Sequence, residues 1–328
     1  MAATAAEPPV TVPVPLGLRL RQTGWLGFLI VPPMLVMVFF VAVPIVSALA
    51  YSLYEWNGLA RGDFIWFGNF ERLLFQEPFN VWTWNAFRHN VIVFVTIMVI
   101  QNLTGFLLAY AIYTQPFGFR FHRTAVFLPV ILSTVIVGFL WKLFLHPLFG
   151  IVNQFLNEVG LGAWALPWLG DERTALGALI FANAWHFVGF PTLIYLAGMQ
   201  RIPDELLDAA RLDGAGTLNL VTRVIWPLVA PSTTIIFVLT FIGAFNWFEL
   251  PYIMAGLDGS PYGSTDVLGL MFYRTAFGNQ SAGVQEFGMG SALAVIIFVF
   301  VLIVAAGWTV YLRRREIQFL PPSRSGRP

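Results

Sequence analysis

Polar and aromatic side chains occur together inside two otherwise apolar stretches of the chain, and these residues are the best suited to chemistry. They are Asn183, Trp185, His186, Phe187 and Phe190 in the first stretch, and Thr240, Asn246, Trp247, Phe248 and Glu249 in the second. Sugars present C–H faces that stack on aromatic rings and hydroxyl groups that need hydrogen-bond donors and acceptors. The combination of aromatic rings with amides or a carboxylate therefore suits a carbohydrate.

Each of these residues also has a purely structural interpretation. The side chains of Asn183, Thr240 and Asn246 can equally hydrogen-bond to neighbouring helices, and the phenylalanines can serve only for packing. His186 can do the same as a lone histidine, and Glu249 can simply be solvated near the end of its stretch. The sequence leaves both interpretations open, although polar residues inside apolar segments are costly and often functional.

A polar segment between the two stretches is the other part of the chain with functional potential. Residues 201–216 predict a short helix outside the apolar segments, with Pro203 at its first position, where a missing N–H costs nothing. Asp204 and Glu205 follow in the first turn, where the helix dipole favours negative charge. Gly214 is expected to end the helix.

A second short helix is expected to follow, until Pro227 redirects the chain. Its apolar stripe consists of Leu218, Val221, Val224 and Ile225. The small side chains of Ala209 and Ala210 in the first helix would let another surface approach its backbone closely. By pattern alone, this pair of helices is either a docking element for a partner or an ordinary amphipathic connector.

The composition indicates where these segments reside. The chain of 328 residues is 58% hydrophobic and 11% charged, whereas soluble domains carry about 25% charged residues. So much apolar surface cannot be hidden from water, and the chain is expected to lie in a lipid bilayer. A net charge of +1 gives no indication of nucleic-acid binding. The absence of cysteine excludes disulfides and thiolate metal sites, and no metal site is expected.

Six apolar segments are long enough to cross a bilayer, which requires about 20 residues each. They are Trp25–Ala50, His89–Tyr113, Thr124–Leu145, Ala175–Met199, Leu228–Leu250 and Met289–Leu312. The predicted fold class is therefore an all-α membrane protein with six transmembrane helices, and the polar segment forms a helix between the fourth and fifth spans.

The distribution of arginines predicts the orientation. With the N-terminus inside, most arginines fall on the cytoplasmic side, and only Arg61, Arg72, Arg88, Arg173 and Arg274 fall outside. Because basic residues favour the cytoplasmic side, both termini and the polar segment are expected to be cytoplasmic. Residues 1–24 and 316–328 are expected to form cytoplasmic tails, the first of them disordered.

The polar segment resembles the "EAA" loop of ABC-importer permeases, in which Glu-Ala-Ala is followed by a glycine and then by an Ile-x-Leu-Pro sequence. The corresponding residues here are Asp208-Ala209-Ala210, Gly214 and Ile225-Trp226-Pro227-Leu228. Two positions depart from the pattern, because Asp208 replaces the glutamate and Trp226 replaces the leucine before the proline. Asp208 keeps the charge on a shorter side chain, so we expect re-aimed or weaker contact at this position rather than lost contact.

Further short sequences resemble the carbohydrate branch of that family, which includes the maltose-transporter permease and its sugar and glycerol-phosphate relatives. They are Tyr51-Ser52-Leu53-Tyr54-Glu55-Trp56, Phe67-Gly68-Asn69-Phe70, Arg123-Thr124-Ala125-Val126-Phe127-Leu128-Pro129, Phe149-Gly150-Ile151-Val152-Asn153, Trp168-Leu169-Gly170, Gly189-Phe190-Pro191 and Tyr273-Arg274-Thr275-Ala276-Phe277. The resemblance implies a six-span permease domain over residues 25–315 in a bacterial inner membrane. The sugar path is then expected at the two polar stretches described first.

The resemblance also implies partners. These are a second six-span permease subunit, two ATPase subunits and an extracytoplasmic sugar-binding protein. The loop 202–228 would dock on one ATPase, and the contacting residues would be Glu205, Asp208, Ala209, Ala210, Arg211, Asp213 and Gly214. The chain itself is not expected to be an enzyme or to bind a cofactor. Its single lysine, Lys142, lies in a span, which excludes a phosphate-binding Gly-x-x-x-x-Gly-Lys loop, so ATP and magnesium would sit on the ATPase subunits.

Two other classes of protein are less consistent with the sequence. A single-chain secondary transporter usually has more spans or an inverted repeat, and neither is visible. A membrane-embedded enzyme needs clustered acidic, histidine or serine residues at a membrane edge, but the acidic residues of the expected outer loops are scattered. The particular sugar stays open, from oligosaccharides to amino sugars and glycerol 3-phosphate.

Overall fold

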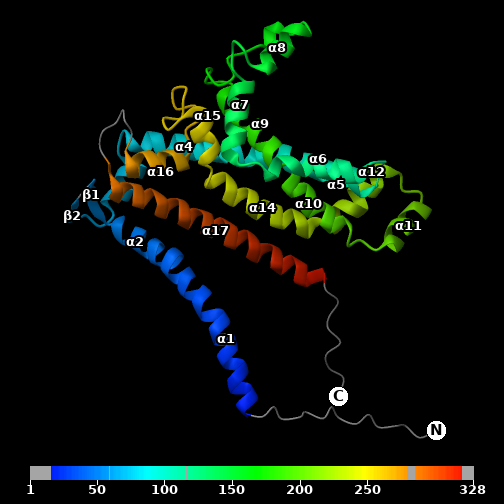
Figure 1. Cartoon of the computed structure of the whole chain (residues 1–328), viewed down its shortest axis with the longest axis horizontal. Helices are drawn as coiled ribbons and strands as arrows, with labels where there is room; N and C mark the ends of the chain where they lie inside the picture. The colour runs from blue at the N-terminus through cyan, green and yellow to red at the C-terminus, as the bar shows by residue number, and fades with distance from the viewer. Residues whose placement is uncertain (1–15, 59, 116, 279–284, 320–328) are drawn as a thin grey trace. The chain divides into compact units, whose positions relative to one another are not determined.

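Helices dominate the described part of the chain (Figure 1). The computed structural model describes residues 16–58, 60–115, 117–278 and 285–319. The chain divides into two compact units, Met1–Ala50 and Tyr51–Pro328. Three helices among the described residues are long and apolar enough to cross a membrane, and three bent helix pairs bring the number of possible spans to six. The predicted number of spans is consistent with this structure.

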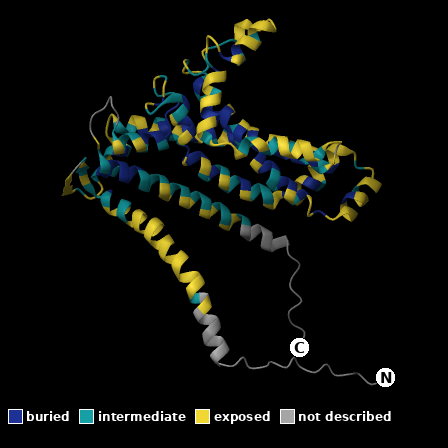
Figure 2. Cartoon of the chain, viewed as in Figure 1, coloured by how far each residue is buried: buried dark blue, intermediate teal, exposed yellow. Residues whose placement is uncertain are grey.

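The described part of the first unit is a single apolar helix built from α1 (Leu16–Met37), a π-helical turn (Val38–Ala42) and α2 (Val43–Tyr51). The π turn lies just before Pro44, whose ring removes a backbone donor from the helix, and such turns commonly accommodate this loss. None of the residues in its most apolar window is buried within the structure (Figure 2). The first span is thus confirmed as a long apolar helix. Of the expected N-terminal tail, residues 1–15 lie outside the described residues, and residues 16–24 belong to α1.

The second unit begins with a small β-hairpin, which departs from the all-α expectation. Strands β1 (Tyr54–Asn57) and β2 (Ala60–Phe64) pair antiparallel, and the rings of Tyr54 and Phe64 meet edge to face with centroids 5.1 Å apart. Asn69, in α3 (Gly68–Phe75), donates to the carbonyls of Ser52 and Tyr54 at 2.9 Å. Aromatic cross-strand pairs stabilise hairpins, so this short strand pair forms in a mainly helical chain.

The second span is longer than predicted. It runs from Phe79 to Tyr113 as α4 (Phe79–Thr96), the π turn η2 (Ile97–Gln101) and α5 (Asn102–Tyr113). The predicted start at His89 was too late, because the polar residues before it continue the helix on its N-terminal side. Gly105 lets α5 pack closely on α10 (Gly189–Met199), because a Cβ atom there would lie 3.0 Å from the Pro191 ring.

The third expected span is not one continuous helix, so this prediction was wrong in geometry. Helices α6 (Phe119–Ile131) and α7 (Thr134–Phe144) meet at 97°. Leu132 and Ser133 between them are extended, and the Ser133 hydroxyl accepts a hydrogen bond from the Val135 N–H. The short elements after α7 are α8 (Ile151–Glu158) and the 3-10 turn η3 (Gly162–Trp164).

The fourth and fifth spans are also bent. Helix α9 (Ala175–Phe187) continues into α10 with a 44° bend, within the predicted bounds. The loop that follows contains α11 (Asp204–Leu212), α12 (Thr217–Asn219), η4 (Leu220–Ile225) and α13 (Trp226–Leu228). After a 67° bend, α14 (Ala230–Phe245) forms the fifth span and ends before the predicted limit, at a break over residues 246–248. Helix α15 (Glu249–Ala255) starts after this break.

The sixth span belongs to α17 (Phe287–Phe319), which follows α16 (Leu268–Phe277). It includes the predicted Met289–Leu312 and continues past the expected start of the C-terminal tail at residue 316, whereas residues 320–328 lie outside the described residues. Two apolar cores hold the second unit together. One joins α4, α9, α14, α16 and α17, and the other joins α5 and α10 to the loop 202–229.

A buried polar cluster fixes the loop between α15 and α16. Asp266 forms a 2.8 Å ion pair with Arg274, whose guanidinium also donates to the Leu257 carbonyl. His89 of α4 bonds to the Asp266 carbonyl at 2.7 Å. Its neighbour Asn90 donates to the Ala244 carbonyl in α14 and accepts from the N–H of residue 268. The cluster therefore ties α4 to the end of α14, next to the break at 246–248.

Replacing Arg274 with methionine is expected to destabilise the protein by about 3–5 kcal/mol at neutral pH, because Asp266 would keep a buried charge without its partner. Burial raises the pKa of Asp266, and Arg274 opposes this rise. Removing Arg274 raises the pKa further, so the protonated form, which burial favours, becomes populated as the pH falls. The free energy of unfolding that Arg274→Met loses relative to the native protein should therefore be largest at about pH 8 and smallest at about pH 5.

Thermal unfolding of the detergent-purified protein at several pH values measures this effect. The double variant Asp266→Asn/Arg274→Met is the matched control, because it lacks the buried carboxylate and should not share the extra loss of stability that Arg274→Met shows toward pH 8. A deficit of Arg274→Met that stays constant on acidification would contradict the assignment.

Candidate functional site

A cavity of about 770 Å³ lies where α9 and α10, the π turn η2 and the end of α14 come together. It is lined by eight of the ten residues predicted for a sugar path: Asn183, Phe187, Phe190, Thr240, Asn246, Trp247, Phe248 and Glu249. Ligand cavities in proteins typically measure about 300–1,000 Å³ and combine apolar walls with a few polar groups. The structure thus brings together residues from two stretches that are far apart in the sequence.

Helical spacing explains only in part which residues of the fourth span reach the cavity, because His186 stands three residues after Asn183 and does not line it. Asn183, Phe187 and Phe190 are separated by four and three residues and share one face. Trp185 and His186 point elsewhere and do not line the cavity. The ring of Trp185 packs edge-on against that of Trp141, with centroids 5.7 Å apart.

His186 instead stabilises the break in the third span. It is buried, and its Nε2 lies 3.1 Å from the carbonyl oxygen of Leu132, which the 97° bend removes from regular helical bonding. This contact agrees with the structural interpretation of His186, in which its ring forms a hydrogen bond between helices.

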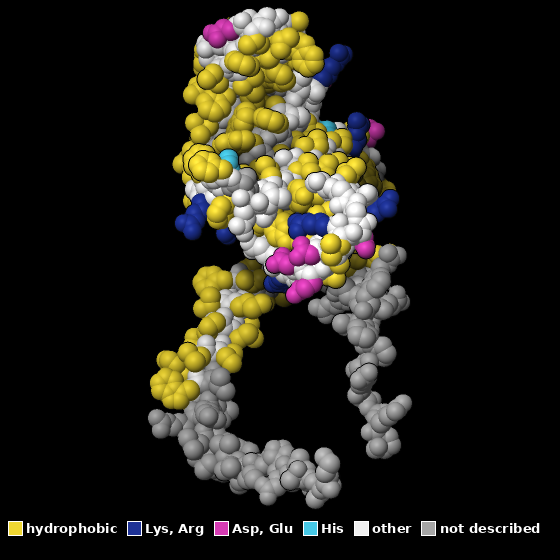
Figure 3. Space-filling model, turned by 90° about the vertical axis from the view of Figure 1, so that its right-hand side faces the viewer, with side chains coloured by type: hydrophobic (Ala, Val, Ile, Leu, Met, Phe, Trp, Pro, Cys, Tyr) yellow, Lys and Arg dark blue, Asp and Glu magenta, His cyan; other side chains and the backbone are white. Residues whose placement is uncertain are grey.

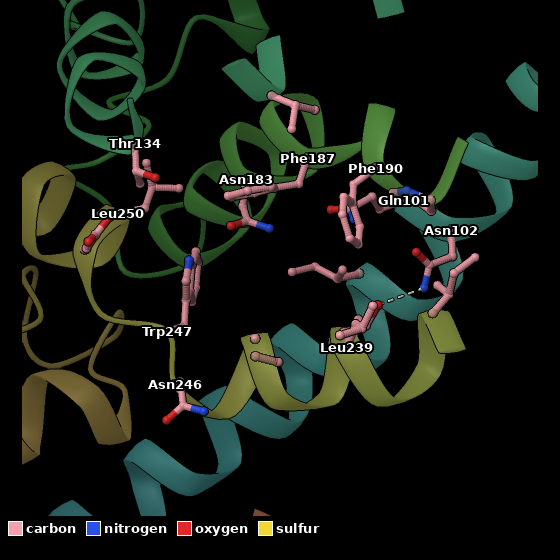
Figure 4. Close-up of a pocket in the computed structure, with 18 of the residues that line it drawn as sticks. Gln101, Asn102, Thr134, Asn183, Phe187, Phe190, Leu239, Asn246, Trp247 and Leu250 are labelled. Carbon is pink, nitrogen blue, oxygen red and sulfur yellow. Dashed lines mark hydrogen bonds between the residues drawn. The ribbon is translucent and has the colours of Figure 1, made fainter. Parts of the chain in front are cut away.

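The break after α14 exposes a second group of residues to the cavity. Figure 4 shows the Trp247 indole and the Asn183 amide near each other on the wall of the cavity. The indole N–H of Trp247 is buried and has no hydrogen-bond partner among the described residues. Asn246 borders the cavity, but its amide donates back to the Ile242 carbonyl at 2.9 Å and caps α14. Glu249 begins α15, where the helix dipole favours its charge.

Three polar lining residues were missed by the sequence reasoning: Gln101, Asn102 and Thr134. Asn102 donates to the Thr240 hydroxyl at 3.3 Å (Figure 4). Their polarity within apolar spans could have indicated them, but no aromatic residue stands within three positions of any of them in the sequence. The completed cavity offers amides, hydroxyls and aromatic rings, which can bind a neutral polyhydroxylated ligand. No group of three acidic or histidine side chains in the described ranges could hold a metal ion.

The loop 202–228 forms a second candidate site with clear local causes. Helix α11 starts one residue later than expected, so Pro203 is its N-cap rather than its first residue, and Asp204 and Glu205 occupy the first turn. The helix ends in a Schellman motif. The N–H of Ala215 donates to the Ala210 carbonyl at 2.9 Å, and the N–H of Gly214 donates to the Arg211 carbonyl at 3.0 Å. Gly214 has φ +82, the left-handed conformation that this motif requires.

One side of this loop is anchored and the other side is free. Leu207 and Ile225 are buried in the core formed with α5 and α10. The opposite side exposes Leu212 (88%) and Leu218 (76%). Also exposed are the predicted contact residues Glu205, Asp208, Ala209, Arg211, Asp213 and Gly214, whereas Ala210 is half-buried.

Asp208 and Arg211 pair with each other at 2.9 Å on this surface. Figure 3 faces the side of the molecule where α11 lies, and acidic and basic side chains gather there.

The apolar stripe predicted for the second short helix is wrong in part. Ile225 is buried and Val221 and Val224 are half-buried, but Leu218 is exposed and Leu220 is buried instead. Residues 220–225 form a π turn, which changes the angular spacing on which the predicted stripe depended.

Known proteins are similar to this chain in sequence and in fold. The family described as "Binding-protein-dependent transport system inner membrane component" matches residues 101–318. The chain is 32% identical over 286 residues to the probable ABC transporter permease protein YurN of Bacillus subtilis, a match that covers 86% of this chain and 94% of the relative. It is 29% identical over 294 residues to the probable starch degradation products transport system permease protein AmyD of Thermoanaerobacterium thermosulfurigenes, covering 90% and 96%.

A solved structure has the same fold. It is the crystal structure of a bacterial alginate ABC transporter in complex with an alginate pentasaccharide-bound periplasmic protein, and one of its chains superimposes with a TM-score of 0.77. The sequences are 22% identical, and the match covers 91% of this chain and 97% of the other.

Substituting Gly214 with alanine is expected to loosen the end of α11, because a left-handed alanine costs about 1–2 kcal/mol. Amide hydrogen exchange at residues 213–216 should become faster by about tenfold. Gly216→Ala is the matched control, since Gly216 has φ −68 and open space around it. Equal exchange rates in the two variants would mean that the motif does not hold the loop.

Proposed function

Because this chain belongs to the family of binding-protein-dependent transport system inner membrane components, we propose that it is a membrane-spanning subunit of an ATP-driven importer that moves a sugar or oligosaccharide into the cytoplasm. The observation that carries the proposal is the cavity at the end of α14, where amides and aromatic rings from three spans converge. Relatives support a carbohydrate, since AmyD is named for starch degradation products and the MsmF protein of Streptococcus mutans for multiple sugar-binding transport.

The cavity chemistry supports a sugar in particular. Phe187, Phe190 and Trp247 provide rings for the C–H faces of a pyranose, and the amide of Asn183 can both donate and accept. The Asn183 amide makes no hydrogen bond to any other described residue, so it is available to a ligand. The bend between α9 and α10 and the break after α14 give these groups a common space. Bent or broken spans near a binding site are a common way of placing polar groups inside a membrane.

ATP hydrolysis is proposed to act on this chain through the loop 202–228. The buried side of the loop packs on α5 and α10, so a force on the loop is transmitted to helices that flank the cavity. Its exposed leucines, carboxylates and small Ala209 form a surface suited to a groove on another protein. The partners proposed are two ATPase subunits that hold ATP and magnesium, a second six-span permease and an extracytoplasmic sugar-binding protein.

In this scheme the transporter alternates between inward-open and outward-open states. ATP on the ATPases and the loaded binding protein both stabilise the outward-open state, so each strengthens the effect of the other. The topology proposed with it places both termini and the loop 202–228 in the cytoplasm, as the arginine distribution predicts.

The coupling surface can be tested with Leu212→Asp. A charge at the centre of a docking surface is expected to reduce ATP-driven uptake about tenfold or more, because burying it costs at least 1.4 kcal/mol, roughly. Initial uptake rates and copurification of the ATPase measure the effect in the native transporter complex. Leu148→Asp is the control, because Leu148 has a similar exposure of 85% in the expected outer loop before α8. Full uptake and full copurification with Leu212→Asp would exclude this surface from coupling.

The sugar path can be tested with Asn183→Ala and Trp247→Ala. Each substitution removes a group directed into the cavity, so uptake is expected to fall about tenfold while the complex still assembles. Trp185→Ala serves as the control, because Trp185 lies in the same helix but outside the cavity. The cavity would lose its proposed role if both cavity variants kept normal affinity and rate.

A further inference from the structure

Two adjacent amide side chains face the cavity from the second span. Gln101 is the last residue of the π turn η2, and Asn102 is the first residue of α5. A π turn adds one residue to a helix, which rotates the face that follows by about 100°. Both side chains line the cavity, and their exposed fractions are 6% and 3%. The irregular turn therefore positions polar side chains at the cavity wall, where single π turns often mark functional sites.

The oxygen atoms of both amides are buried without hydrogen-bond partners. Neither Gln101 Oε1 nor Asn102 Oδ1 has a partner within the described ranges. The amide nitrogen of Asn102 is engaged, since it contacts Met98 Sδ at 3.0 Å and Thr240 Oγ1 at 3.3 Å. Buried polar atoms are normally satisfied, because leaving one unpaired lowers stability. Two such acceptors side by side at a cavity indicate a ligand that donates hydrogen bonds there.

The rest of the cavity complements such a ligand. The unpaired indole N–H of Trp247 adds a buried donor to the two acceptors. A sugar hydroxyl both donates and accepts, so one polyol can satisfy groups of both kinds. The phenylalanine rings between them suit its C–H faces.

Charge narrows the substrate class further. Glu249 is the single ionisable residue among the described residues that line the cavity. Its carboxylate and the two unpaired amide oxygens disfavour a second anion in the same space. The negative charge of a uronate or a sugar phosphate must be balanced by hydrogen-bond donors or a cation. Proteins that bind such anions commonly use arginine for this purpose. The lining residues provide no such cation.

We propose that Gln101 and Asn102 determine specificity by accepting hydrogen bonds from hydroxyl groups of a neutral sugar, and that the cavity excludes uronates and sugar phosphates. This inference rests on the proposed function as a sugar importer. It adds two residues of the second span to the site and narrows the class of substrate.

The sharpest test replaces Gln101, because its side chain makes no hydrogen bond to any described residue. Gln101→Met removes the acceptor at similar shape and breaks no bond within the protein. Gln101→Asn keeps an uncharged amide oxygen on a side chain that is one methylene shorter. Thr104→Val is the control on the same helix, since the Thr104 hydroxyl bonds to its own helix at the Ile100 carbonyl and is exposed. Gln101→Leu replaces the methionine variant should that variant fail to assemble.

Uptake is measured in the source strain, so that all natural partners are present. The labelled probes are maltose, trehalose and N,N′-diacetylchitobiose as neutral sugars, and digalacturonate and glucose 6-phosphate as anions. For the neutral probe that the native strain imports, Gln101→Met should lower the maximal rate about tenfold, the effect of one lost hydrogen bond. Gln101→Asn should retain that rate within about threefold, and Thr104→Val should leave it unchanged. Membrane levels of the complex are measured in parallel.

Other outcomes separate this inference from the proposed function. A native rate with Gln101→Met, or equal losses with Gln101→Met and Gln101→Asn, overturns the recognition role while sugar import stands. Preferred uptake of an anionic probe by the native strain overturns the neutral substrate class and leaves the importer assignment intact. If deletion of this chain leaves the uptake of every saccharide probe unchanged, the proposed function itself is overturned.

Discussion

The lack of hydrogen-bonding solvent in a bilayer is the constraint on which this structure depends. A polar group inside an apolar span must find a partner in the protein or in a ligand. Most of the buried polar groups find protein partners: His186 bonds to the carbonyl of Leu132 at a helix break, and Asn90 joins the end of α14 to the start of α16. Those that remain unpaired on the wall of the cavity mark it as a place for a ligand.

Irregular helix geometry produces that cavity. The 97° bend between α6 and α7, the π turn before Asn102 and the break after α14 each turn side chains or backbone away from regular helical packing. Each irregularity is held by a specific polar contact or by an inserted turn, so the cavity is built into the fold. The Asp266–Arg274 pair lies near the same break and ties the loop between α15 and α16 to it through His89 and Asn90.

The loop 202–228 connects this arrangement to a surface outside the spans. Its Schellman motif shapes the end of α11 locally, while Leu207 and Ile225 join it to the core of α5 and α10. Because α5 and α10 also flank the cavity, one continuous core lies between the exposed leucines of the loop and the polar lining. This continuity is what a transporter needs to convert docking at one end into a change at the other.

The sequence by itself determined the features that depend on local chemistry. The apolar spans, the acidic first turn of α11 and its end at Gly214 could be predicted, because hydrophobic length and helix capping involve residues close together in the chain. Most of the polar and aromatic cavity residues could be named as well, since aromatic and amide side chains together inside spans are unusual. Only the tertiary structure decided that Trp185 and His186 face away from the cavity and that Gln101 and Asn102 face into it. Those orientations depend on how helices distant in sequence pack and bend, and a single span carries no information about its neighbours.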